Sequence, residues 1–81
     1  MTQDELIKKI EDVALPVSEK DFQELIAATI DGGFMTEMEI ARLIGCSRPS
    51  VNRWKMGMNF PMPGMRPLAL RDIKEHIQKA T

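Results

Sequence analysis

The sequence contains little that could cross-link a small fold: one cysteine and one histidine among 81 residues. A single cysteine cannot form an internal disulfide, and together with one histidine it cannot supply the four ligands of a structural zinc site. A chain of this length buries only about 60% of its unfolded surface, so its stability is marginal without a disulfide, a metal or a partner chain. A partner chain is therefore an option that the composition leaves open.

We expect neither a membrane-spanning nor a secretory segment. No apolar run approaches the roughly 20 residues that span a membrane, and the N-terminal MTQDELIKK lacks the apolar core of a signal peptide. The single cysteine fits a reducing compartment, so we expect a cytoplasmic protein without membrane contact. The sequence has no glycine-rich phosphate loop, no metal-ligand spacing and no nucleophile beside a base. We therefore expect no enzyme activity, cofactor, metal or small-molecule ligand.

The net charge of −1 averages two unlike halves of the chain. Residues 1–39 carry ten acidic and three basic side chains, whereas residues 40–81 carry eight basic and two acidic ones. No acid occurs between Ile40 and Arg71. Local potential governs encounters with charged partners more than the total charge does. The second half can therefore attract an anion that the first half repels, unless the two halves simply neutralise each other in the fold.

Hydrophobic periodicity predicts a single all-α domain over residues 1–81, with five helices and no sheet. The first helix covers residues 1–15 and closes before a proline, because the residue preceding proline resists the α conformation. Ser18 can cap the second helix, which Gly32-Gly33 ends with a left-handed residue. The last helix covers residues 66–79. We expect the core to be formed by the apolar residues of these helices and by two methionines near residue 36. These residues are Leu6, Ile7, Ile10, Val13, Ala14, Phe22, Leu25, Ile26, Ile30, Met35, Met38, Leu70, Ile73, Ile77 and Ala80.

A capping box marks the start of a third helix. Thr36 is followed three residues later by Glu39, and this spacing lets the hydroxyl and the carboxylate bind free backbone amides at a helix start. The helix is expected over residues 37–44. Gly45 ends it, because a positive φ is cheap only for glycine.

A fourth helix is expected over residues 47–56, with Ser47 as its cap and Pro49 in its first turn, where no amide partner is lost. With the third helix and the three-residue turn between them, it gives residues 36–56 the arrangement of a helix-turn-helix. Ala41 is small enough to stand where the two helices cross. The apolar residues expected to point inward are Ile40, Ile44, Cys46, Val51 and Trp54.

This pattern of a small residue, a glycine four residues later and apolar positions at these spacings resembles the helix-turn-helix of the lambda-repressor/Cro-like family of phage and bacterial transcriptional regulators. The tail RWKMGMNFP is also similar to the family pattern. The resemblance covers roughly residues 22–61, and residues 1–14 have no counterpart in the minimal family domain. It implies a compact lambda-repressor-like domain that binds double-stranded DNA as a repressor. The implied binding mode is a homodimer on a two-fold operator, with helix 47–56 in the major groove.

The outer face of the fourth helix carries chemistry suited to DNA. Arginine can bind guanine and asparagine can bind adenine through paired hydrogen bonds, and proline can lie against a thymine methyl. The expected base contacts are Arg48, Pro49, Asn52 and Arg53, and the expected phosphate contacts are Thr36, Ser47, Ser50 and Lys55. Glu37 would repel a phosphate as a bare charge, so backbone amides would have to dominate at that helix start. The alternative for Asn52 and Arg53 is an ordinary solvated face.

Other chemically active residues are expected to have simpler roles. Cys46 and Trp54 are expected in the core, and His76 at the surface or its edge. Arg42 and Arg66 are expected to face solvent or form salt bridges rather than contact phosphate. Four methionines bracket the apolar loop of residues 57–65 and form either plain surface or an adaptable interface; they are Met56, Met58, Met62 and Met65.

A second hypothesis is a protein-interaction module that keeps the helix-turn-helix fold and no longer binds DNA. The acidic first half motivates it, because such a surface can bind a basic partner or mimic nucleic acid. The methionine-rich loop is the other surface that this module would use.

Overall fold

Five helices make up the part of the chain that the computed structural model describes, residues 1–80, and no strand occurs within it. They are α1 (Gln3–Glu11), α2 (Glu19–Asp31), α3 (Glu37–Ile44), α4 (Arg48–Met56) and α5 (Arg66–Lys79). The all-α class predicted from hydrophobic periodicity is thereby confirmed. The Cα radius of gyration is 11.2 Å, close to the value of about 12 Å for a compact chain of this length. Among these helices, none combines the length and the apolar character that crossing a membrane requires.

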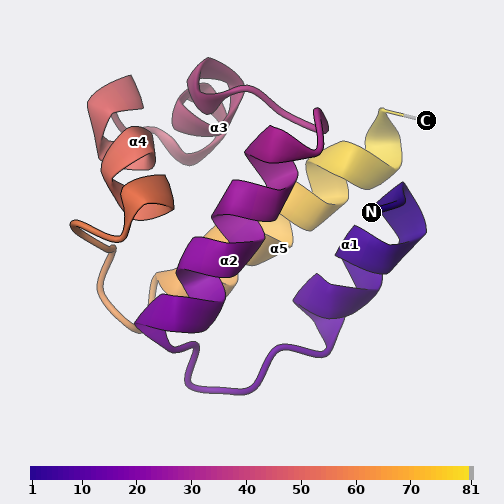
Figure 1. Ribbon diagram of the computed structural model, residues 1–81, viewed down its shortest axis with the longest axis horizontal. Coiled ribbons are helices and arrows are strands. Elements are labelled where there is room, and N and C mark those ends of the chain that lie inside the picture. The colour runs from indigo at the N-terminus through magenta and orange to yellow at the C-terminus, as the bar shows by residue number, and fades with distance from the viewer. Residues whose placement is uncertain (81) are drawn as a thin grey trace.

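Helix α2 occupies the middle of the fold, with α1 and α4 on opposite sides of it and α5 behind it in the view of Figure 1. It packs against both α1 and α4. Phe22, Leu25 and Ile26 are buried as predicted. Ile30 is only half-buried, and Thr29 is buried in its place. The Thr29 hydroxyl donates a hydrogen bond to the Leu25 carbonyl at 2.8 Å, which removes the cost of burying an unbonded hydroxyl.

Helix α1 is shorter than the predicted helix over residues 1–15. Its start is fixed by a second capping box, in which the Glu5 amide donates to the Thr2 hydroxyl at 3.2 Å and the Thr2 amide donates to the Glu5 carboxylate at 3.1 Å. The helix ends at Glu11 rather than just before Pro16. The proline therefore constrains only the loop that follows the helix, and the predicted end was wrong.

The early end of α1 changes which residues reach the core. Val17 is buried, and the chain has to leave the helix axis well before this residue in order to place it there. Val13 lies outside the helix yet packs half-buried against the core, whereas Ala14 is exposed. The prediction of a core-facing Ala14 was wrong because it assumed that the helix continued.

Two further residues expected in the core lie outside it. Met38 is 43% exposed, whereas Met35 is buried. Met38 faces outward because two residues separate side chains by about 200° around a helix, and Ile40 is the position that points inward. Ala80 is exposed because α5 ends at Lys79, before the apolar stripe could extend to it. The buried apolar residues of α5 are Ala69, Leu70, Ile73 and Ile77.

Arg66, at the start of α5, is buried rather than solvent-facing, and of the two expected alternatives it takes the salt bridge. Its guanidinium donates to the Val17 carbonyl at 2.9 Å and to the Pro61 carbonyl at 3.0 Å. It also lies 3.7 Å from a Glu19 oxygen and 5.8 Å from the centre of the Phe60 ring. One side chain thus ties the loop before α2 and the loop before α5 to the same helix, because its several N–H donors can satisfy two loop carbonyls at once.

Candidate nucleic-acid interface

The connection between α3 and α4 is a turn of three residues that begins at Gly45. Gly45 is left-handed, with φ of 87°, as predicted. The amides of Gly45 and Cys46 both donate to the Ala41 carbonyl, at 2.8 and 3.0 Å, and this closes the end of α3. Ser47 then caps α4 by accepting a hydrogen bond from the Ser50 amide at 3.3 Å. The turn brings α3 and α4 into direct packing contact.

The inner face of α4 is anchored in the core. Val51 has no exposed surface and Trp54 is 7% exposed. The Trp54 ring meets the Phe22 ring of α2 edge to face, with centroids 5.6 Å apart. Ile40 and Ala41 of α3 are buried as well. Packing among α2, α3 and α4 therefore turns the side of α4 that carries Val51 and Trp54 towards the core, as predicted.

Ile44 and Cys46 lie at the margin of the core, where both are half-buried and pack against it. Burial raises the pKa of the Cys46 thiol, so the thiol stays protonated at neutral pH and behaves as a small apolar group. His76 of α5 is half-buried, at the edge of the fold as expected.

The opposite side of α4 faces solvent. All four predicted base contacts are exposed, namely Arg48, Pro49, Asn52 and Arg53. Of the predicted phosphate contacts, Thr36 and Ser47 are exposed, and Ser50 and Lys55 are half-buried. Arg42 of α3 is exposed, as expected. The structure therefore places cationic and amide side chains on the outward surface of one short helix.

The start of α3 is closed by the predicted capping box. The Thr36 amide donates to the Glu39 carboxylate at 2.9 Å, and the Glu39 amide donates to the Thr36 hydroxyl at 3.1 Å. These hydrogen bonds from Thr36 hold the pKa of Glu39 below its ordinary value.

Glu37, the first residue of α3, lies beside the outer face of α4. Its Oε2 accepts a hydrogen bond from Asn52 Nδ2 at 2.8 Å, and its Oε1 lies 3.5 Å from Arg48 Nε. The Glu37 side chain is 18% exposed. The sequence indicates an acid at this helix start, but no local pattern predicts its partners, because they depend on how α3 and α4 cross.

A second carboxylate contacts α4 from the end of α2. Lys55 Nζ lies 2.8 Å from Asp31 Oδ1, and this hydrogen bond raises the pKa of the Lys55 ammonium. The Lys55 carbonyl accepts a hydrogen bond from Gln23 Nε2 at 3.2 Å, which also joins α4 to α2. Arg53, in contrast, is exposed, and no hydrogen bond or ion pair holds its side chain within residues 1–80.

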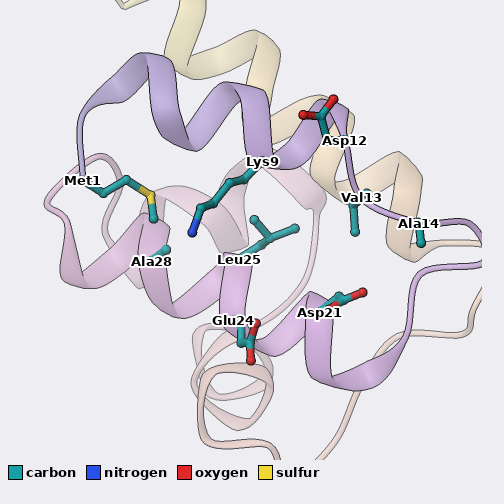
Figure 2. A pocket seen from close by; sticks show the side chains of 9 residues that line it. All are labelled: Met1, Lys9, Asp12, Val13, Ala14, Asp21, Glu24, Leu25 and Ala28. Carbon is teal, nitrogen blue, oxygen red and sulfur yellow. The ribbon is translucent and has the colours of Figure 1, made fainter.

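An open cavity of about 280 Å³ lies between α1 and α2, on the other side of α2 from α4. Figure 2 shows Lys9 of α1 reaching over this cavity towards α2. Three acids lie around it, whereas Lys9 is the one basic side chain in its lining. The lining residues are Met1, Lys9, Asp12, Val13, Ala14, Asp21, Glu24, Leu25 and Ala28. This balance of charge disfavours phosphate, so α4 is the better candidate for contact with nucleic acid.

Comparison of the chain with protein-family models, with curated proteins and with solved structures finds no match. Within residues 1–80, no group of three or more histidine, cysteine or acidic side chains is arranged to hold a metal ion.

Proposed function

We propose that this chain binds double-stranded DNA in a sequence-specific manner, as a transcriptional repressor of the phage or bacterial type. In this proposal α3, the turn and α4 form a lambda-repressor/Cro-like helix-turn-helix, and α4 enters the major groove. The proposal rests on one observation: one side of α4 is buried in the core and the other side is exposed to solvent. Val51 and Trp54 are buried, whereas Asn52 and Arg53 between them are exposed. Helix α4 carries no acid of its own.

The exposed residues of α4 suit the edges of base pairs. Arg53 and Arg48 can each donate two parallel hydrogen bonds to guanine, and Asn52 can both donate to and accept from adenine. Pro49 has no amide hydrogen and offers an apolar surface to a thymine methyl. Each paired contact contributes about 1–3 kcal/mol of discrimination against a wrong base. Arg53 is the strongest candidate, because no carboxylate in residues 1–80 competes for it.

Phosphate contacts would come from the rim of the same surface. Thr36, Ser47 and Ser50 carry hydroxyls that can donate to phosphate oxygens. Lys55 would exchange Asp31 for a phosphate, and this exchange is feasible because Asp31 is largely exposed to solvent. Such contacts give affinity and register without reading sequence.

We further propose that the chain acts as a homodimer. One α4 reads too few base pairs to select a site among about a million competitors, and a second copy supplies another half-site about one helical turn away. Helix α5 is the proposed contact, because Leu68 in it is 41% exposed and Met65, the residue just before it, is 52% exposed. Both line an open groove together with Ile44, Gly45, Cys46, Trp54, Pro61, Ala69 and Asp72.

Sedimentation tests the dimer directly. The wild type should sediment as a dimer at micromolar concentration, and Leu68→Glu should sediment as a monomer, because it places a charge in the proposed contact. A wild type that stays monomeric both free and on DNA would eliminate the dimer.

A second candidate function is a protein-interaction module, which one observation favours. The four methionines around the loop before α5 are all well exposed: Met56 at 60%, Met58 at 74%, Met62 at 76% and Met65 at 52%. Flexible thioether side chains adapt to partner surfaces of varied shape. This module would bind no duplex at any salt concentration, whereas a DNA reader binds at low salt and weakens steeply as salt rises.

The test of the DNA-binding proposal is a salt titration with a fluorescent duplex. Wild-type protein should bind at low salt, and the logarithm of its affinity should fall linearly with the logarithm of salt concentration. Arg53→Ala should weaken binding, whereas Lys8→Ala removes the same charge from α1, across α2 from α4, and should not. Equal behaviour of the two variants would show that α4 is not the binding surface.

Selection of bound sequences from random duplex should then identify a preferred site. Against that site, Asn52→Ala should lose about 5- to 150-fold in affinity, the equivalent of one paired base contact. The helical circular dichroism should stay unchanged, because Asn52 is exposed. Normal binding by both Asn52→Ala and Arg53→Ala would refute the assignment of the outer face.

A further inference from the structure

Glu37 contacts two of the proposed base-reading side chains with one carboxylate, Asn52 through Oε2 and Arg48 through Oε1. We propose that Glu37 is a positioning residue that sets the sequence specificity of α4, by holding Asn52 and Arg48 in the orientation in which they meet bases. This inference rests on the proposed DNA-binding function and adds a residue that touches neither base nor phosphate.

The contact with Asn52 leaves its base-reading edge free. An asparagine amide has two N–H hydrogens and one oxygen, and Glu37 accepts one of those hydrogens at 2.8 Å. In the proposed arrangement Glu37 takes the hydrogen that points away from Oδ1, so Oδ1 and the hydrogen beside it remain as the acceptor and the donor that adenine requires. A free asparagine can rotate its amide to present nitrogen or oxygen to the same base. The hydrogen bond to Glu37 selects one orientation before DNA arrives, which lowers the cost of ordering the side chain.

The contact with Arg48 has the same property. Glu37 approaches Arg48 at Nε, 3.5 Å away, and Nε carries only one of the five N–H groups of a guanidinium. The two terminal nitrogens remain available, and 61% of the side chain is exposed. Guanine recognition requires two parallel N–H donors. Arg48 can therefore keep its contact with Glu37 while its far end reads a base.

Glu37 is itself well placed for this task. Its side chain is 18% exposed, and the amides of the first turn of α3 favour a carboxylate at that helix end. The capping box that closes α3 uses Thr36 and Glu39 and leaves Glu37 free of any capping role. The carboxylate nevertheless repels the phosphates of any duplex. This repulsion lowers the affinity for every sequence, whereas the ordering of Asn52 and Arg48 favours only the correct site. The expected net effect of Glu37 is therefore better discrimination between sequences rather than higher affinity.

The experiment compares three variants that each remove one negative charge beside α4. Glu37→Ala removes both contacts, and Glu37→Gln keeps an oxygen that can accept from Asn52. Asp31→Asn is the matched control, because Asp31 pairs within residues 1–80 only with Lys55. The measured quantity is the ratio of affinity for the selected site to affinity for an unrelated duplex, at one salt concentration. All three variants should bind the unrelated duplex more tightly than wild type does, because each reduces repulsion.

The affinity ratio separates positioning from charge. Glu37→Ala should lower it about tenfold, within the range for loss of one paired base contact. Glu37→Gln should recover most of the discrimination at the base that Asn52 reads, and Asp31→Asn should leave the ratio unchanged. Circular dichroism verifies that each variant is folded. If Glu37→Ala folds poorly, Glu37→Gln is compared with Asp31→Asn at the base that Arg48 reads. Discrimination at that base should fall for Glu37→Gln and not for Asp31→Asn, because glutamine lacks the charge that attracts Arg48.

Two results would overturn the role of Glu37: a Glu37→Ala ratio equal to that of wild type, or an equal fall in the ratio for Asp31→Asn. Both presuppose a wild type that binds the selected site in preference to other duplexes. A wild type that binds no duplex at any salt overturns the proposed function itself, so the two failures are distinguishable.

Discussion

Trp54 of α4 meets Phe22 of α2 edge to face, with ring planes at 72° and centroids 5.6 Å apart. Phe22 also contacts the Phe60 ring, 6.4 Å away. One fully buried residue of the central helix therefore anchors α4 and the loop that follows it. The outward direction of Asn52 and Arg53 depends on this contact, because it turns the side of α4 that carries Val51 and Trp54 into the core and leaves the other side exposed.

Replacing Trp54 should therefore destabilise the fold strongly. Trp54→Ala leaves a cavity against Phe22, and the expected loss in the free energy of unfolding is about 3–5 kcal/mol. Trp54→Phe keeps an aromatic edge and should lose less. Urea denaturation followed by circular dichroism measures both values. A loss below about 1 kcal/mol for Trp54→Ala would contradict the anchoring role.

Gly45 should resist replacement for a backbone reason. Its φ is 87°, and no atom lies within 4 Å of where a Cβ would stand, so the cost of Gly45→Ala is conformational rather than steric. The expected loss is about 1–2 kcal/mol of unfolding free energy. Gly64 is the matched control, since it also has open space but no positive φ. Gly64→Ala should be neutral or stabilising by up to about 1 kcal/mol, and equal effects at the two glycines would refute this reasoning.

Arg66 should be essential to stability although it is charged. Arg66→Met keeps the apolar bulk and leaves the Val17 and Pro61 carbonyls without their donor. The expected loss is about 2–4 kcal/mol. Arg71→Met removes an exposed arginine of the same helix that pairs with its neighbour Asp72, and it should change stability by less than about 0.5 kcal/mol. Thermal melts of the two variants test the difference.

Acid should weaken the start of α3. Hydrogen bonds from Thr36 lower the pKa of Glu39 below its ordinary value of 4.5. A carboxyl whose pKa is lowered by folding stabilises the fold above its unfolded pKa, and this stabilisation is lost as the pH falls through the folded pKa. Glu39→Gln should thus lose less thermal stability than wild type between about pH 6 and about pH 3. Parallel pH profiles for the two proteins would contradict the prediction.

Local signals in the sequence predicted the α3–α4 unit well. The capping box of Thr36 and Glu39, the left-handed Gly45 and the Ser47 cap are all confirmed. Each depends on atoms within a few residues of one another, so the sequence spacing contains the needed information. The inner and outer faces of α4 also followed from helical periodicity, because Val51 and Trp54 were its only large apolar residues within the helix before Met56.

Non-local packing accounts for the errors. The end of α1 and the exposure of Ala14 and Met38 depend on what the neighbouring helices and loops cover. The burial of Arg66, whose salt bridge was one of the expected alternatives, depends on the same packing. No sequence window shows that the loop carbonyls of Val17 and Pro61 converge on one guanidinium. The same holds for the carboxylates beside α4.

By itself, the sequence determined the all-α class, the start of α3, the turn at Gly45 and the polar character of the outer face of α4. Those features arise from helical periodicity and from hydrogen bonds between residues close along the chain. Only the tertiary structure decided that Glu37 contacts Asn52 and Arg48, and that Asp31 contacts Lys55. These pairs join different helices, and the distance between their interacting atoms is set by how the helices cross and pack, which no local spacing encodes.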